Sequence, residues 1–259
     1  MLSVRESDKY LQRIGYDGGV TPSLGNLQKL MTCHLRSVPY ETVTIHRSGQ
    51  TPSLAVDDLF AKIVEGKGGG YCFEQNTLFQ ALLECLGYVV RSCFCRSTDT
   101  PGQVDPINHR GVLVTLEGKQ YLADVGWGGP MAQGPLLLEA GTHEVAGKRY
   151  VVEPLSDHWI AIDRFSTKTD EAGDPLRVGI MELCLAEVKD EDFDALNRKF
   201  SSPGSEFRDT AMANISRPNG HVALSDRTLT IMEDGRKTVR ELSPEDVDAA
   251  LKEHFGLII

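Results

Sequence analysis

The residue best suited to chemistry in this sequence is a cysteine that follows three glycines. Cys72 comes directly after Gly68-Gly69-Gly70-Tyr71, and apolar residues with helical spacing continue to Leu86, before Gly87 at the expected C′ position. The pattern predicts that Cys72 lies in the first turn of a helix, where unpaired N–H groups and the helix dipole favour a thiolate. Glycines without Cβ atoms would also let an acyl group come close. The alternative is a small buried hydrophobic residue, as free cysteines often are.

A nucleophilic cysteine needs a base, and the base needs an orienting group. Residues 109–116 and 120–125 have the composition of two strands, with a hairpin turn at Glu117-Gly118-Lys119. If Glu117 pairs with Gly118, residue 111 faces Asp124 and shares its sheet face with His109. His109 and Asp124 would then be diagonal neighbours within side-chain reach. A carboxylate in an apolar strand is costly unless it is paired, and an imidazolium is a natural partner. A register slip of one residue would separate them, and His109 would then be a surface or packing residue.

The elements that must position these residues divide the chain into three parts. Residues 1–86 have helical periodicity, with helices expected to start at Thr21-Pro22 and at Thr51 or Ser53, and Cys72 on the last helix. Residues 87–188 are predicted to form an antiparallel sheet or barrel that carries His109 and Asp124. Its expected strands are 89–95, 111–116, 120–125, 145–152 and 159–165, followed by a polar loop at 166–176. Residues 189–259 are expected to hold a helix, two or three strands and a final helix that starts at Ser243-Pro244.

Composition excludes several classes of function. The chain of 259 residues has 27 Lys and Arg against 37 Asp and Glu, a net charge of −10, and shows no basic stripe for nucleic acid. No apolar run approaches the roughly 20 residues of a membrane span, and the charged N-terminus has no signal-peptide core. We therefore expect a cytoplasmic protein with reduced thiols. Cys93 and Cys95 share one face of a strand without a second cysteine pair nearby, which favours packing over zinc, so no metal is expected.

These motifs resemble those of the arylamine N-acetyltransferases. The similarity lies in the order Cys, His, Asp, in residues 69–76 around Cys72 and 124–129 around Asp124, and in segments 10–16, 34–41 and 192–207. The resemblance implies an α+β fold with an N-terminal helical bundle, a central antiparallel β-barrel and a C-terminal α/β lid around a cysteine-proteinase- or transglutaminase-like core. It also implies a catalytic triad in which Cys72 is the nucleophile, His109 the base and Asp124 the orienting carboxylate.

The family's chemistry is a double displacement. An acetyl group, or another short acyl group, would pass from acetyl-CoA to Cys72 and then to an arylamine or hydrazine nitrogen. The implied partners are these small molecules, with no nucleic acid and no membrane, and the implied role is xenobiotic metabolism. Candidate substrate- and cofactor-binding residues are Tyr71, Phe73, Gly126, Trp127 and Gly128. Trp127 would supply an aromatic wall, or else fill the core beside a turn.

The sequence departs from the family pattern directly before the glycines of the cysteine motif. The family usually has arginine at the position of Gly68, and here the nearest cation is Lys67. Any ion pair between that arginine and a neighbouring glutamate is lost or rebuilt, and Lys67 does not reproduce a guanidinium fork. Other functions also remain open: an amide synthase or longer-acyl transferase of the same fold, a cysteine hydrolase or transglutaminase-like enzyme, and a binding protein with an inactive triad.

Overall fold

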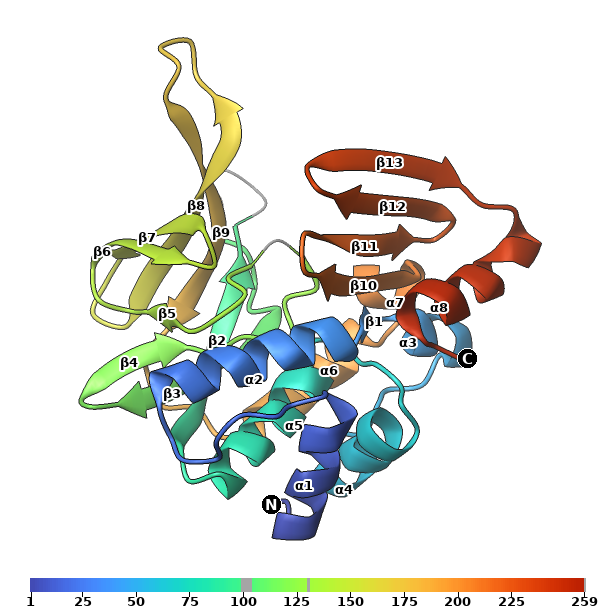
Figure 1. Ribbon diagram of the computed structural model, residues 1–259, viewed down its shortest axis with the longest axis horizontal. Helices are drawn as coiled ribbons and strands as arrows, with labels where there is room; N and C mark the ends of the chain where they lie inside the picture. Colours follow the sequence, from blue (N-terminus) through green and yellow to red (C-terminus); the bar gives the residue numbers. More distant parts are fainter. Residues whose placement is uncertain (99–103, 130, 259) are drawn as a thin grey trace.

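Helices form the N-terminal part of the computed structural model, which describes residues 1–98, 104–129 and 131–258 (Figure 1). They are α1 (Val4–Arg13), α2 (Leu24–Ser37), α3 (Val43–Ser48), α4 (Val56–Leu59), the π-helix η1 (Phe60–Glu65) and α5 (Cys72–Cys85). Helix α5 is central: every residue from 72 to 83 is buried, and the helix packs against α1, α4 and the strands of the neighbouring sheet. A helix buried on all sides holds its side chains in fixed positions, which suits a helix that carries a reactive residue.

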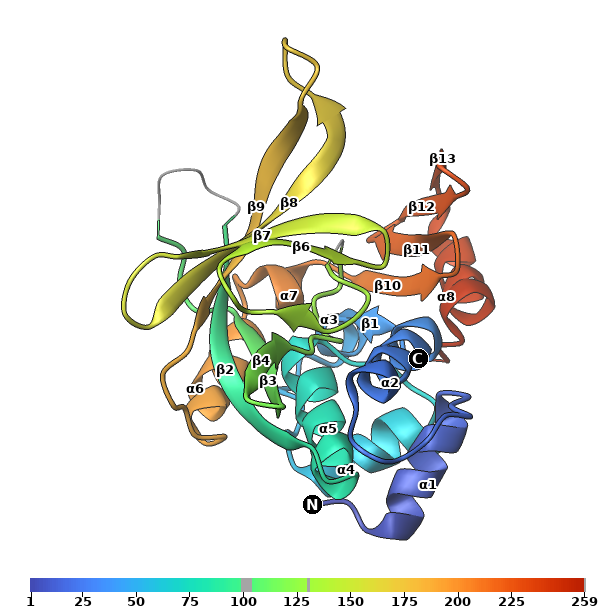
Figure 2. The same cartoon turned by 60° about the vertical axis from the view of Figure 1, so that its left-hand side comes forward.

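An eight-stranded antiparallel sheet follows in the middle of the chain and curls into a nearly closed barrel (Figure 2). Its strand order is β5-β4-β3-β2-β9-β8-β7-β6. The strands are β2 (Val89–Ser97), β3 (His109–Leu116), β4 (Lys119–Leu122), β5 (Leu136–Leu137), β6 (Gly141–Val145), β7 (Lys148–Pro154), β8 (Trp159–Thr169) and β9 (Pro175–Cys184). The first and last strands of this order, β5 and β6, contact each other. The predicted fold class is therefore confirmed.

The C-terminal part builds a second sheet with strand order β1-β10-β11-β12-β13. Its strands are β1 (Tyr40–Glu41), β10 (Met212–Arg217), β11 (Gly220–Ser225), β12 (Thr228–Glu233) and β13 (Arg236–Glu241), and its helices are α6 (Asp192–Phe200), α7 (Glu206–Asp209), the 3-10 helix η2 (Pro244–Asp246) and α8 (Val247–Phe255). The edge strand β1 comes from the helical part of the chain. The division at residues 86 and 188 stays a prediction, and this sheet contains residues from both sides of it.

The predicted hairpin register is confirmed. Leu113 pairs with Leu122 and Leu116 with Lys119, so paired positions run as the Glu117-Gly118 turn requires. Both turn residues have left-handed backbones, with φ of 51° and 77°, as a tight two-residue hairpin needs. Strand β4 ends at Leu122, however, so Asp124 lies in the loop after the strand and not within a strand 120–125.

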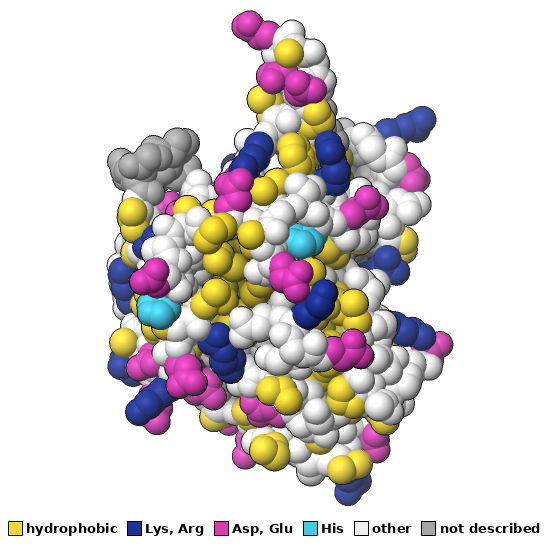
Figure 3. Space-filling model, turned by 90° about the vertical axis from the view of Figure 1, so that its left-hand side faces the viewer, with side chains coloured by type: hydrophobic (Ala, Val, Ile, Leu, Met, Phe, Trp, Pro, Cys, Tyr) yellow, Lys and Arg dark blue, Asp and Glu magenta, His cyan; other side chains and the backbone are white. Residues whose placement is uncertain are grey.

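The prediction of a polar loop at residues 166–176 is wrong. Strands β8 and β9 extend through most of it, with Phe165 paired to Arg177 and Thr169 to Pro175. This β8–β9 arm projects from the barrel, and Figure 3 shows acidic side chains at its tip and hydrophobic ones gathered on the barrel face beneath it. Because the arm is solvated on both faces, its strands lack the alternation of polar and apolar residues that marks a half-buried strand.

Three further boundaries differ from the expectations. Helix α2 is capped by the Ser23 hydroxyl, which accepts the N–H of Asn26, and not by Thr21. The helix expected to start at Thr51 or Ser53 begins at Val56. The single strand expected at 145–152 is the β6–β7 hairpin, which turns at Ala146 and Gly147. Within the residues that the structure describes, no helix has both the length and the apolar character needed to cross a bilayer.

Candidate active site

Cys72 is the first residue of α5, as predicted from the sequence. The thiol-bearing residue is 2% exposed, and its Sγ lies 3.9 Å from the carbonyl oxygen of Asn108. The glycines before Cys72 let other protein atoms come close to their backbone. A Cβ on Gly69 would lie 2.3 Å from the carbonyl oxygen of Pro39, and one on Gly70 would lie 2.9 Å from the Cβ of Glu74. The tight loop therefore depends on glycine to seat the start of α5 against the rest of the helical part.

His109 and Asp124 meet as the hairpin register required. The His109 Nε2 atom lies 2.6 Å from Asp124 Oδ2, and the two residues are 4% and 2% exposed. Burial opposes the charged imidazole, but the Asp124 carboxylate outweighs it and raises the pKa of His109 to about 10. Burial also opposes the carboxylate, yet the His109 charge and three hydrogen bonds lower the pKa of Asp124. The pair is therefore an imidazolium and a carboxylate at neutral pH.

Cys72 contributes to this charge distribution. Its side chain is among the partners that favour the charged form of His109, after Asp124. Asp124 bonds to Nε2 of the ring, which leaves Nδ1 for a second partner. An imidazole held on one side by a carboxylate and close to a thiol on the other can exchange a proton with that thiol.

Asn76 is a site residue that the sequence reasoning did not assign. Its Nδ2 donates to Asp124 Oδ1 at 2.8 Å, and its Oδ1 accepts the N–H of Val125 at 3.0 Å. The N–H of Gly126 also donates to Asp124 Oδ1 at 2.8 Å. These bonds fix the carboxylate in the loop after β4. The available signal was spacing, because Asn76 follows Cys72 by four residues on one face of α5.

A chain of neutral hydrogen bonds holds one side of the loop before Cys72. Gln75 donates through Nε2 to the carbonyl oxygens of Pro39 and Gly70 at 2.9 and 2.7 Å. Its Oε1 must then accept from His34 Nε2 at 3.0 Å, so His34 Nδ1 accepts from the hydroxyl of Tyr10 at 2.8 Å. Burial lowers the pKa of His34 to about 4, which keeps this histidine neutral. The buried His34 thus orients Gln75, which holds the backbone of Pro39 and Gly70.

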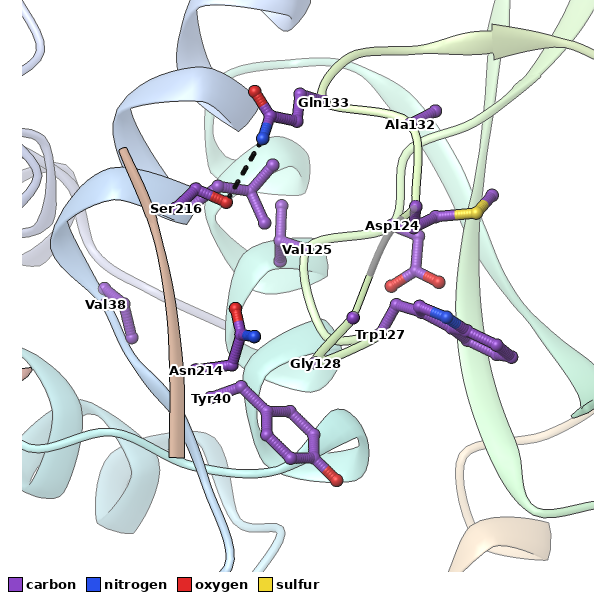
Figure 4. Close-up of a pocket in the computed structure, with 13 residues that line it drawn as sticks. Val38, Tyr40, Asp124, Val125, Trp127, Gly128, Ala132, Gln133, Asn214 and Ser216 are labelled. Carbon is purple, nitrogen blue, oxygen red and sulfur yellow. Dashed lines mark hydrogen bonds between the residues drawn. The ribbon is translucent and has the colours of Figure 1, made fainter. Parts of the chain in front are cut away.

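Trp127 and Tyr40 line a pocket beside the candidate triad (Figure 4). The pocket measures about 30 Å³ and also includes Asp124, Asn214 and Gln133 in its wall. The rings of Trp127 and His109 meet edge to face, with centroids 4.9 Å apart. The loop after β4 forms one wall and the strands β1 and β10 the other. Strand β10 was not predicted, so Asn214 was missed.

The other predicted binding residues lie in different surroundings. Gly128 lines the pocket with φ of 72°, and a Cβ there would lie 2.8 Å from the Tyr40 ring. Gly126 packs on the helix, where a Cβ would lie 2.9 Å from the Cα of Cys72. Tyr71 and Phe73 are fully buried in an aromatic cluster with α6 and α7, which contains Phe193, Phe200 and Phe207. Their role in binding stays a prediction.

A basic groove continues from this pocket between the barrel and the C-terminal sheet. The groove has a volume of about 430 Å³ and shares Gly129, Met131, Gln133, Asn214 and Ser216 with the pocket. Its described lining contains the cations of Lys148, Arg164 and Arg217 together with His221, and no carboxylate. In a chain of net charge −10, these cations give the groove a local positive potential. Across the described residues, no group of three or more His, Cys, Asp or Glu could hold a metal ion.

Comparisons with known proteins agree with this architecture. A family model described as N-acetyltransferase matches residues 23–259. The arylamine N-acetyltransferase of Mycolicibacterium smegmatis is 39% identical over 137 residues, which cover 51% of this chain and 50% of the relative. Proansamycin X synthase of Amycolatopsis mediterranei is 28% identical and covers 96% of each chain. The solved structure of Mycobacterium marinum arylamine N-acetyltransferase in complex with CoA is 27% identical, with a TM-score of 0.86, and covers 96% of this chain and 91% of that one.

The fold and the matched family model place the chain in the class of proteins described as N-acetyltransferases. The match to the M. smegmatis relative spans half of that relative's length. The family model covers nearly the whole chain, and the chain belongs to the arylamine N-acetyltransferase family.

Proposed function

We propose that this protein transfers an acetyl group from acetyl-CoA to the nitrogen of an arylamine or hydrazine, through an acyl-cysteine at Cys72. The observation that supports it most directly is the meeting of His109 with Asp124 and with Cys72 at the start of α5. Asp124 also lines the pocket from which the basic groove continues. The family membership supports the same reaction. CoA is an anion with several phosphates, and it matches the basic groove in charge.

In the first half-reaction, the Cys72 thiolate attacks the thioester carbonyl, and a bond forms between sulfur and the acyl carbon. The bond from that carbon to the CoA sulfur breaks, and His109 donates a proton to the leaving thiolate. N–H groups in the first turn of α5 would stabilise the oxyanion, because the helix itself provides them with no acceptor. Asp124 acts as a positioning residue that fixes the ring and supports its charge.

In the second half-reaction, the acceptor nitrogen attacks the acyl carbon of acyl-Cys72. His109 takes the proton that the nitrogen loses, the carbon–sulfur bond breaks, and the Cys72 thiolate is restored. Trp127 and Tyr40 give the pocket two aromatic walls that would contact a flat aromatic acceptor, but at about 30 Å³ the pocket must widen to admit one. We assign the protein a role in xenobiotic metabolism in the cytoplasm, where the six free thiols fit a reducing compartment.

The test is acetylation in the absence of an acceptor. Incubation with acetyl-CoA should add one acetyl group, and peptide mass should locate it at Cys72. Cys72→Ala should take up no label, and addition of an arylamine should remove the label from wild type and yield the N-acetyl product. Labelling at Cys85 or Cys93, or no labelling of folded protein, would exclude acyl transfer through Cys72.

The same assay separates the alternative functions. A cysteine hydrolase would release the acyl group to water at the same rate with and without an amine. A longer-acyl transferase would be labelled faster by longer acyl-CoA donors. An amide synthase would act on an acyl chain that carries its own amine, a reaction of interest because proansamycin X synthase is among the relatives.

A further inference from the structure

Two carboxylates lie buried behind the loop that leads into Cys72. Glu41 of β1 and Glu74 of α5 each have side chains only 1% exposed. Glu74 accepts the N–H of Tyr71 at 3.2 Å, and the N–H of Glu41 donates to the Gly70 carbonyl at 3.0 Å. Both residues therefore touch the backbone directly before the candidate nucleophile. Two ionised carboxylates in such a site repel each other and cannot both persist without a cation.

Lys62 of the π-helix η1 supplies that cation. Its Nζ lies 2.8 Å from Glu74 Oε1 and 3.1 Å from Glu41 Oε1. Burial opposes the charge of Lys62, but the two carboxylates outweigh it and raise its pKa. Burial and the nearby Glu41 raise the pKa of Glu74, and Lys62 opposes both effects. The three groups carry a net charge of about −1 when all are ionised.

The backbone of Lys62 also explains Gly68, where the family usually has arginine. The N–H of Gly68 donates to the carbonyl oxygen of Lys62 at 3.0 Å. A Cβ at residue 68 would lie 2.9 Å from that same oxygen, closer than such atoms approach. An arginine at this position is therefore incompatible with this backbone. The π-helical turn brings Lys62 to the two carboxylates and at the same time requires glycine at residue 68.

We propose that Lys62 is a positioning residue for the Cys72 nucleophile, bridging Glu41 and Glu74 so that they fix the Gly70-Tyr71 backbone. The inference rests on the proposed function only in taking Cys72 as the nucleophile. Lys67 does not share this role. Its backbone is left-handed, with φ of 54°, and it lines a surface groove with Lys9 and Glu65.

The charge of this cluster gives the proposal a pH signature. The groups that face it are Glu41, Glu74 and Lys62, with Tyr40, Tyr71 and Cys72 in electrostatic range and the Arg13 guanidinium on the carbonyl oxygens of residues 67 and 68. Without Lys62, one carboxylate must take up a proton to stay buried. Its pKa would rise in the folded state, so the variant would be most stable at acid pH and would lose stability as the pH rises.

The experiment measures alkylation of Cys72 by iodoacetamide in Lys62→Met, with peptide mass to identify the site. The variant-to-wild-type ratio of rates should fall by about 10- to 100-fold at about pH 8, as expected when a reacting group is misplaced. The ratio should return toward one near about pH 5, because protonation of one carboxylate removes the repulsion. Adding Glu74→Gln should restore most of the rate at both pH values, since the amide oxygen still accepts the Tyr71 N–H.

Lys67→Met is the matched control, because it removes the same charge from the adjacent loop, and its ratio should stay near one. A ratio near one for Lys62→Met at every pH would overturn the proposal. So would a loss that neither acid nor Glu74→Gln relieves. If Lys62→Met does not fold at neutral pH, thermal melts should show that it folds at acid pH or when Glu74→Gln is added. If it folds under neither condition, the proposal is wrong. Alkylation needs no turnover, so these outcomes are independent of whether wild type is acetylated at Cys72.

Discussion

The ion pair between His109 and Asp124 determines how the site responds to pH. The folded-state pKa of His109 is raised to about 10. Its contribution to stability is therefore complete below the unfolded pKa of the imidazole and is lost as the pH rises from there to the folded-state pKa. The pKa of Asp124 is lowered, so its contribution is present above the unfolded pKa of about 4 and is lost as the pH falls. The pair thus stabilises the fold across the neutral range.

We expect alkylation of Cys72 to stay fast well below about pH 7, because a neighbouring imidazolium favours the thiolate. His109→Gln should move the rate profile toward that of an ordinary thiol, because the neighbouring positive charge is lost. The measurement is the alkylation rate against pH, with the modified site identified by peptide mass and the other five cysteines as internal controls. A wild-type rate profile that is unchanged by His109→Gln would contradict the expectation.

Asp124→Asn should lower kcat by up to about 10⁴-fold, by analogy with serine triads, because the amide removes the counter-charge and favours the wrong tautomer. The hydrogen bonds from Asn76 and Gly126 converge on Oδ1, so an amide oxygen there would keep the loop in place. Kinetics and a thermal melt should be measured together. Near-wild-type turnover in a folded variant would show that Asp124 has no role in the reaction.

At the scale of the elements, the site depends on how closely the loop after β4 approaches α5. Gly126 makes this contact possible, because a Cβ at this residue would collide with the backbone of Cys72. Strand β3 is fixed in turn by α5 and β2, which pack against it. Gly126 was predicted to bind substrate or cofactor, and that role stays a prediction. In the structure its missing side chain leaves room for the backbone of Cys72.

Gly126→Ala should destabilise the protein by about 1–3 kcal/mol and slow acylation, because the new methyl group overpacks the contact with α5. Gly25→Ala is the control, since no atom lies within 4 Å of its added Cβ in helix α2, and alanine favours a helix. Urea unfolding and the rate of acetyl transfer to Cys72 would be compared in the two variants. If both variants were equally stable, the loop after β4 could move away from α5 without cost, and the close contact would not matter for stability.

Sequence reasoning reached the parts of this fold that rest on local pattern. The β3–β4 register followed from a turn that needs two left-handed residues, and this register brought His109 to Asp124. Strand β9 was missed because its first half is exposed on both faces and gives no period of two. Strand β10 was missed although Ala213 and Ile215 alternate with polar residues, because two apolar positions are too short a signal. Because β10 was not predicted, Asn214 and its wall of the pocket were not predicted either. The role of Lys62 depends on a π-helical turn, and no residue pattern in the sequence indicates that turn.

At the scale of the whole molecule, the acidic surface is interrupted by the basic groove at the pocket. A net charge of −10 would repel an anionic donor, and the groove offsets this repulsion locally. Burial, followed by the charge of Arg164, lowers the pKa of Lys148. Within the groove, the cations therefore repel one another, and an anion between them would relieve that repulsion.

Lys148→Gln and Arg164→Gln should each raise the KM for acetyl-CoA by about tenfold with little change in kcat, as loss of a charge-assisted contact predicts. The KM of an acetyl thioester of N-acetylcysteamine, which has no phosphates, should not change. Added salt should weaken acetyl-CoA binding in wild type more than in the variants. Equal effects on both donors would place the CoA phosphates elsewhere.

The pairing of β1 with β10 has a consequence for how the protein acquires its reactive centre. Tyr40 and Glu41 pair with residues 214 and 213, and Tyr40 also bridges to Gly70, so the loop before Cys72 is clamped from the far end of the chain. Closing so long a loop is slow compared with forming a local helix. A nascent chain would contain α5 long before this clamp exists. We therefore expect the amide of Gly70 to gain protection from hydrogen exchange during refolding together with those of β10, so that the loop before Cys72 is fixed only after β10 has been made and has folded.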